Sequence, residues 1–147
     1  MQARAVFEAA LNVQAEGGAP FPEVMIPLVG SVREFNPQAA IVRQTAEAVF
    51  AERGAKVHYL VGTMIETPRA ALVADSIGKA AEFFSFGTND LTQMTMGFSR
   101  DDAGSFLPEY VKKGIYEQNP FRSIDQKGVG QLVEMAAQKG RAVRPDI

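Results

Sequence analysis

The sequence contains no cysteine and a single histidine, His58, among its 147 residues. Zinc and softer metal ions are bound mainly through thiolate and imidazole groups, so this composition argues against such a site. The absence of cysteine also fits a reducing compartment, and we expect the protein to be cytoplasmic.

Two further features are missing: a long apolar run and a marked excess of charge. No stretch stays apolar over the roughly 20 residues that a membrane-spanning helix needs. The formal net charge of −2 gives no electrostatic footprint for nucleic acid. Residues 1–13 include Glu8 and are typical of a mildly amphipathic helix rather than a signal peptide. We therefore expect neither a membrane nor a nucleic-acid partner.

Predicted strands and helices alternate along the chain. Its length and its 46% hydrophobic content suit one domain with its own core. Apolar runs bounded by Gly and Pro predict strands, whereas helical periodicity with capping residues predicts helices. The strands are expected at 23–29, 56–65 and 83–86, and the helices at 1–13, 36–53, 68–80, 91–96, 107–113 and 126–139. This alternation is typical of an α/β fold with a parallel sheet.

Apolar residues at helical spacing predict which helix faces form the core. The predicted inward residues are Ala5, Val6, Ala9, Ala10 and Val13 in the first helix, Ile41, Val42, Ala46, Val49 and Phe50 in the second, and Val129, Leu132, Val133 and Ala136 in the last. Asp125 is expected to cap the last helix and Gly140 to end it.

An acidic residue follows two consecutive predicted strands. The strand up to Ile65 leads into Glu66, and the strand up to Phe86 leads through Gly87, Thr88 and Asn89 into Asp90. Loops at strand ends often carry chemistry, because the strands below hold them rigid. The plainer interpretation is that the polar residues form a turn that caps the next helix.

Parallel neighbouring strands would bring the two carboxylates together. Such strands lie about 4.8 Å apart, so Glu66 and Asp90 would face one mouth. Two carboxylates so placed repel each other unless a proton or a cation lies between them. Mg²⁺ suits this arrangement, because it takes one or two carboxylates and completes its octahedron with water and substrate oxygens. The sequence therefore predicts a magnesium site.

The stretch from Glu82 to Gln93 resembles the signature of the phosphoenolpyruvate-utilising enzymes. Within that family, residues 61–72 (Val-Gly-Thr-Met-Ile-Glu-Thr-Pro-Arg-Ala-Ala-Leu) and 96–104 (Met-Gly-Phe-Ser-Arg-Asp-Asp-Ala-Gly) resemble the pyruvate phosphate dikinase group. The resemblance extends over essentially the whole chain. It implies a part of the family's phosphoenolpyruvate/pyruvate-binding (β/α)8 barrel, since a whole barrel takes about 250 residues.

The same resemblance implies roles for individual residues. Glu66 and Asp90 match magnesium ligands, whereas Gly87, Thr88, Asn89 and Asp90 match residues that contact pyruvate or phosphoenolpyruvate. A cysteine that exchanges a proton with the pyruvate methyl group is expected beyond residue 147, and phosphoryl-binding arginines are expected before Met1. The ATP-binding and phosphohistidine domains are expected as missing partners, so this fragment is predicted to be inactive alone.

Three alternatives stay open at this point. The chain could belong to phosphoenolpyruvate synthase or to the phosphotransferase-system enzyme I, which share the Gly-Thr-Asn-Asp-like core. It could instead be a non-catalytic packing or dimerisation module, and a homo-oligomer is possible because cut barrel edges tend to associate. His58 is predicted to be structural rather than the family's phosphocarrier. Residues 99–104 are predicted to form a solvated loop with local ion pairs, or else a contact at the edge of a cleft.

Overall fold

The computed structural model describes all residues, Met1–Ile147, and contains one three-stranded parallel sheet. The strands β1 (Glu23–Ile26), β2 (Leu60–Ile65) and β3 (Phe84–Phe86) lie in that order across the sheet. Ile26 pairs with Thr63, and Ile65 pairs with Phe86. The predicted α/β class with parallel strands is confirmed. These three strands form an open sheet, so the (β/α)8 barrel stays a prediction.

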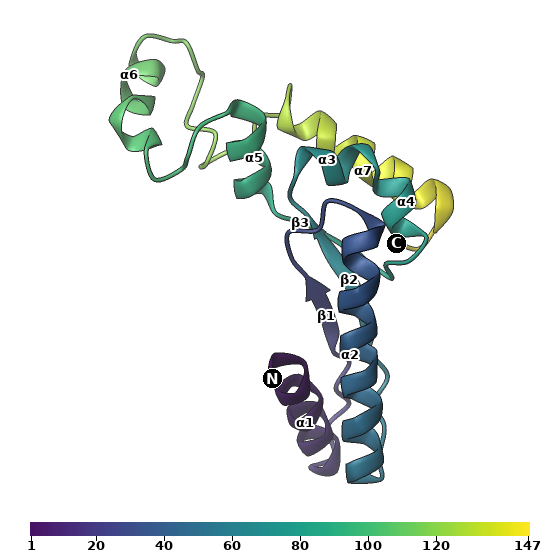
Figure 1. Ribbon diagram of the computed structural model, residues 1–147. Helices are drawn as coiled ribbons and strands as arrows, with labels where there is room; N and C mark the ends of the chain where they lie inside the picture. Colours follow the sequence, from purple (N-terminus) through teal and green to yellow (C-terminus); the bar gives the residue numbers. More distant parts are fainter.

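Seven α-helices and one 3₁₀-helix accompany the sheet. Their bounds are α1 Gln2–Ala15, α2 Val32–Arg53, α3 Pro68–Leu72, α4 Ala74–Gly78, α5 Thr88–Met96, η1 Ala103–Ser105, α6 Leu107–Lys112 and α7 Val129–Val143. The long α2 runs beside the sheet, and α1 packs against the C-terminal half of α2 (Figure 1). Helix α7 lies along α3 and α4. The segment between α5 and α7, which carries α6, extends away from the sheet (Figure 1). We call this segment the arm. No helix is both long and apolar enough to cross a membrane.

The inward face of α1 differs from the prediction. Phe7, Ala10 and Leu11 are buried, whereas Val6 and Val13 are 41% and 46% exposed. The reason is aromatic packing: Phe7 meets Phe50 of α2 edge-on, with ring centroids 5.6 Å apart, and it packs on Tyr59 as well. A buried aromatic ring removes more apolar surface from water than a valine does. The helix therefore turns Phe7 toward the core.

Helix α2 begins earlier than the predicted Asn36. Ser31 is its N-cap, and the Glu34 carboxylate accepts hydrogen bonds from the Gly30 N–H and the Ser31 hydroxyl at 2.9 and 3.0 Å. These bonds fix the start of the helix at Ser31, and Pro37 lies inside the helix. Of the predicted core residues in α2, all are buried except Ile41, which is 55% exposed.

The remaining helices also differ in their bounds. The predicted helix over 68–80 divides at Val73 into α3 and α4. Helix α7 begins at Val129 and continues through Gly140, which the sequence predicted as its end. Gly140 is part of α7 because the helix passes close to Phe84 at this point: a Cβ on Gly140 would stand 2.6 Å from the Phe84 ring. Asp125 still accepts a hydrogen bond from the Val129 N–H, at 3.3 Å.

Candidate metal and ligand site

Glu66 directly follows β2 and lies at the edge where all three strands end. Its residue surface is 5% exposed, and its carboxylate Oε1 accepts a hydrogen bond of 2.6 Å from the backbone N–H of Leu28, just after β1. Burial raises the pKa of the Glu66 carboxyl group, the Leu28 N–H opposes the shift, and neighbouring Asp90 adds to it. Glu66 is therefore a desolvated acid with one satisfied oxygen.

Asp90 belongs to α5, the helix that follows β3 along the chain. It lies in the first turn of α5, where its carboxylate accepts a hydrogen bond of 2.8 Å from the Gln93 side chain. Next to burial, the neighbouring Asp90 adds to the raised pKa of Glu66, so the two carboxyl groups lie near each other. Both acids follow neighbouring strands at the same edge of the sheet, as the sequence predicted. Their role as metal ligands stays a prediction.

Thr88 and Asn89 lie in α5 rather than in a loop, which corrects the prediction of a helix beginning at Leu91. Gly87 is the N-cap and offers no side-chain acceptor, so the first backbone N–H groups of α5 remain available. Thr88 and Asn89 are exposed. The helix N-terminus carries partial positive charge, which favours an anion beside it. No side chain of this stretch caps α5, and the functional interpretation stays a prediction.

Gly87 touches Glu66 directly. Its N–H donates to the Ile65 carbonyl at 3.1 Å, which extends the pairing of β2 with β3 by one step. A Cβ at Gly87 would stand 2.6 Å from the Glu66 Cβ and 2.7 Å from its Oε2. Gly87 is therefore required for close approach, whereas its role as a ligand contact remains a prediction.

Leu28 is the site residue that sequence reasoning missed. It is the one non-glycine residue with a positive φ, 55°, and 60% of its residue surface is exposed. The sequence carries no signal for this, because the left-handed conformation normally selects Gly, Asn or Asp. The strand predicted over 23–29 is shorter in the structure: β1 ends at Ile26, because Pro27 has no N–H to donate to a neighbouring strand.

The donor set at this edge fits a hard cation and does not fit zinc. Two carboxyl groups lie near each other, and no group of three or more His, Cys, Asp or Glu side chains could enclose a metal ion. Mg²⁺ requires only one or two carboxylates from the protein, whereas structural zinc requires four N or S ligands. The raised pKa of Glu66 marks a place where a cation in place of a proton would relieve repulsion.

His58 and the segment 99–104 lie outside this site. His58 is exposed in the approach to β2, at the end opposite Glu66, and its ring lies 5.1 Å from that of Phe21. Arg100 does not form the predicted local ion pair. Its guanidinium lies 5.7 Å from the centre of the Phe121 ring, and the backbone N–H of Arg100 donates to the Gln93 side chain.

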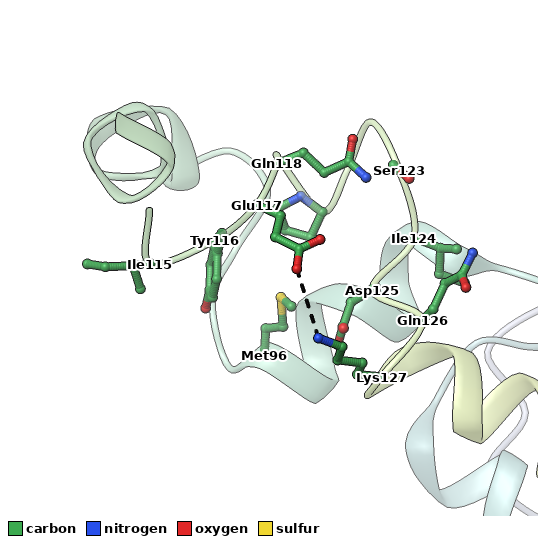
Figure 2. A pocket seen from close by; sticks show the side chains of 11 residues that line it. Met96, Ile115, Tyr116, Glu117, Gln118, Ser123, Ile124, Asp125, Gln126 and Lys127 are labelled. Carbon is green, nitrogen blue, oxygen red and sulfur yellow. Dashed lines mark ion pairs between the residues drawn. The ribbon is translucent and has the colours of Figure 1, made fainter. Parts of the chain in front are cut away.

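A separate hollow of about 490 Å³ lies between the end of α5 and residues 115–127. Figure 2 shows Met96 on its floor and the ion pair between Glu117 and Lys127, 3.9 Å apart, across it. Neither Glu66 nor Asp90 lines it. The two carboxyl groups and this hollow are therefore distinct features of the molecule.

Comparison with known proteins adds an independent line of evidence. Residues 1–144 match the family described as "PEP-utilising enzyme, PEP-binding domain". Over all 147 residues, the chain is 60% identical to pyruvate, phosphate dikinase 1 of Arabidopsis thaliana, a chloroplastic protein. It is 58% identical to the chloroplastic pyruvate, phosphate dikinase of Mesembryanthemum crystallinum and 56% identical to pyruvate, phosphate dikinase 2 of Zea mays. The chain spans 15%, 16% and 17% of these relatives.

Proposed function

This chain belongs to the PEP-utilising enzymes and carries their PEP-binding domain, and from this premise we propose that it forms the divalent-cation part of a phosphoenolpyruvate/pyruvate site. The activity proposed for the complete enzyme is that of pyruvate phosphate dikinase, which interconverts ATP, phosphate and pyruvate with AMP, pyrophosphate and phosphoenolpyruvate. The names of the relatives favour this activity over phosphoenolpyruvate synthase or the phosphotransferase-system enzyme I.

One observation carries the proposal: the Glu66 carboxyl group is buried where the strands end, with Asp90 near enough to raise its pKa further. Glu66 and Asp90 would hold Mg²⁺, which supplies Lewis-acid stabilisation of negative charge on substrate oxygens. Burial of Glu66 limits competition from water, and the Leu28 N–H keeps its Oε1 fixed.

The start of α5 would bind the substrate's anionic end. Its first backbone N–H groups, with that of Thr88 among them, are available for hydrogen bonds to carboxylate oxygens, and the exposed Asn89 side chain can donate another. The partial positive charge of the helix N-terminus adds to this attraction. Gly87 allows α5 to begin in contact with Glu66. Cation and substrate oxygens would thus lie side by side.

The binding test uses Mg²⁺ titrations with and without oxalate, a planar dianion that resembles pyruvate enolate. We expect Mg²⁺-dependent binding of oxalate by the wild-type chain, and its loss in Glu66→Ala and in Asp90→Ala. Glu16→Ala is the matched control, because Glu16 is exposed at the end of α1. If both site variants bind metal and oxalate as the wild type does, the proposal is wrong.

The activity test replaces the matching segment of the Arabidopsis relative by this chain. Identity of 60% over the full segment makes such an exchange feasible. We expect the chimera to convert ATP, phosphate and pyruvate into AMP, pyrophosphate and phosphoenolpyruvate. A folded chimera that forms no phosphoenolpyruvate from pyruvate would contradict the proposal. Glu66→Gln in the chimera should abolish turnover.

A further inference from the structure

Leu28 has a backbone conformation that is uncommon for leucine, and its side chain is exposed. Its φ of 55° lies in the left-handed region, and its residue surface is 60% exposed. Side chains with a Cβ rarely adopt that backbone conformation, and single outliers of this kind concentrate at functional sites. Neither feature is explained by packing, because the side chain does not belong to the core.

The backbone of Leu28 has a defined partner. Its N–H donates a hydrogen bond of 2.6 Å to Glu66 Oε1, while Glu66 Oε2 lies on the side of Gly87. Hydrogen bonds from a backbone N–H to a carboxylate are charge-assisted and orient the acceptor. The positive φ lets the chain turn toward α2 while this N–H stays on Glu66.

The residues after Leu28 keep it in this conformation. Val29 is 2% exposed, and the Gly30 N–H donates to Glu34 at 2.9 Å. The Arg69 guanidinium donates to the Gly30 carbonyl from the first turn of α3. A strained conformation persists only where its surroundings fix it, and here anchors from both α2 and α3 do so.

We propose that Leu28 is a positioning residue that acts through its left-handed backbone: its N–H fixes one Glu66 oxygen, so that the other is presented toward α5 and Asp90. The proposal rests on the proposed cation site, which it deepens. It assigns the function to the backbone conformation at position 28 and gives the leucine side chain no part in holding Glu66.

The test compares the Mn²⁺ affinities of four variants, because a backbone role and a side-chain role of Leu28 predict opposite orders of affinity. Gly and Asn adopt a positive φ readily, whereas Val and Ile adopt it poorly. We therefore expect Leu28→Gly and Leu28→Asn to bind Mn²⁺, measured by electron paramagnetic resonance, within about twofold of the wild type. Leu28→Val and Leu28→Ile should bind at least about tenfold more weakly. An apolar role would give the reverse order, with Val and Ile close to wild type, and four equal affinities would equally overturn the proposal.

A second measurement separates this inference from the proposed function and does not require the Leu28 variants to fold. If the wild-type chain binds no Mn²⁺ or Mg²⁺, the proposed cation site is wrong. The hydrogen bond from Leu28 to Glu66 is then tested through the amide proton of Leu28. In the metal-free, ¹⁵N-labelled chain we expect that proton to resonate downfield and to move upfield in Glu66→Ala but not in Glu16→Ala. An unshifted amide in Glu66→Ala would overturn the positioning role.

Discussion

The backbone of Gly87 lies against the side chain of Glu66 with no room for a Cβ between them. A methyl group there would stand 2.6 Å from the Glu66 Cβ and 2.7 Å from the Met64 sulfur. Glu66 is thus held from two sides, by this close contact and by the Leu28 N–H. The position of the buried acid depends on the absence of one methyl group.

Gly87→Ala should therefore destabilise the chain and weaken Mg²⁺ binding together. Overpacking of a closely packed position costs about 1–3 kcal/mol, and the shift needed to accept the methyl group would displace Glu66. Gly104→Ala is the matched control, because nothing lies within 4 Å of a Cβ at that position. Urea unfolding and Mg²⁺ titration measure the two effects. Equal behaviour of the two variants would contradict the contact.

Glu66 should give metal-free folding a distinct pH dependence. Burial, with Asp90, raises its pKa above the ordinary value of 4.5, so the folded chain prefers the protonated acid. Its contribution to stability is then fully present below 4.5 and is lost as pH rises through the raised pKa. In EDTA, the stability of wild type relative to Glu66→Gln should fall as pH rises from about 4 to 8, measured by urea unfolding.

A control variant and the effect of added Mg²⁺ test the same interpretation of Glu66. Gln keeps an oxygen that can accept from the Leu28 N–H, so the comparison isolates the charge. Glu16→Gln, at an exposed position, should follow the wild-type curve at every pH. Mg²⁺ should stabilise wild type above the raised pKa and leave Glu66→Gln unchanged. A relative stability that is flat or rises with pH would show that Glu66 is not a desolvated acid.

The sequence predicted the parts of the fold and site that follow from repeating patterns. Alternation of apolar runs with helical periods predicted a parallel sheet, and a sheet with Glu66 and Asp90 after neighbouring strands brings both acids to one edge. Parallel pairing alone was sufficient for that conclusion. No knowledge of individual side-chain contacts was needed.

What escaped prediction depends on contacts between distant residues. The face of α1 is chosen by the packing of Phe7 on Phe50 and Tyr59, which no local pattern shows. The start of α2 is the exception, since it is fixed locally: Glu34 accepts hydrogen bonds from Gly30 and Ser31, four and three residues before it. The left-handed Leu28 lies beyond sequence patterns, since its partners come from β2, α2 and α3.

Glu82 should stabilise the start of β2 through one hydrogen bond. Its carboxylate accepts from the buried Val61 N–H at 2.7 Å and pairs with Arg43 at 2.9 Å. Glu82→Ala leaves that N–H without its side-chain acceptor, so we expect a loss of about 1–3 kcal/mol in urea unfolding. Arg43→Ala removes only a partly exposed ion pair and should cost less than about 1 kcal/mol.

Glu82→Gln completes this comparison, because it keeps an acceptor for Val61 and removes the charge. We expect its stability to resemble that of Arg43→Ala. If Glu82→Gln is as unstable as Glu82→Ala, the ion pair rather than the hydrogen bond to β2 is the important contact.

The arm should unfold independently of the site. Phe98 packs edge-on against Phe106 and Phe121, with ring centroids 5.2 and 6.0 Å apart, and these residues lie outside the main core cluster. Phe98→Ala should therefore lower hydrogen-exchange protection in α6 while protection in β2 and α2 stays unchanged. Tyr110→Phe is the control, because it keeps the ring contact with Phe106. Asp90 is linked to the arm through Gln93, which also accepts from the backbone N–H of Arg100. Because neither acid belongs to the ring cluster, Mg²⁺ affinity should change less than protection in α6. Loss of protection throughout the chain would instead show that the arm and the sheet fold as one unit.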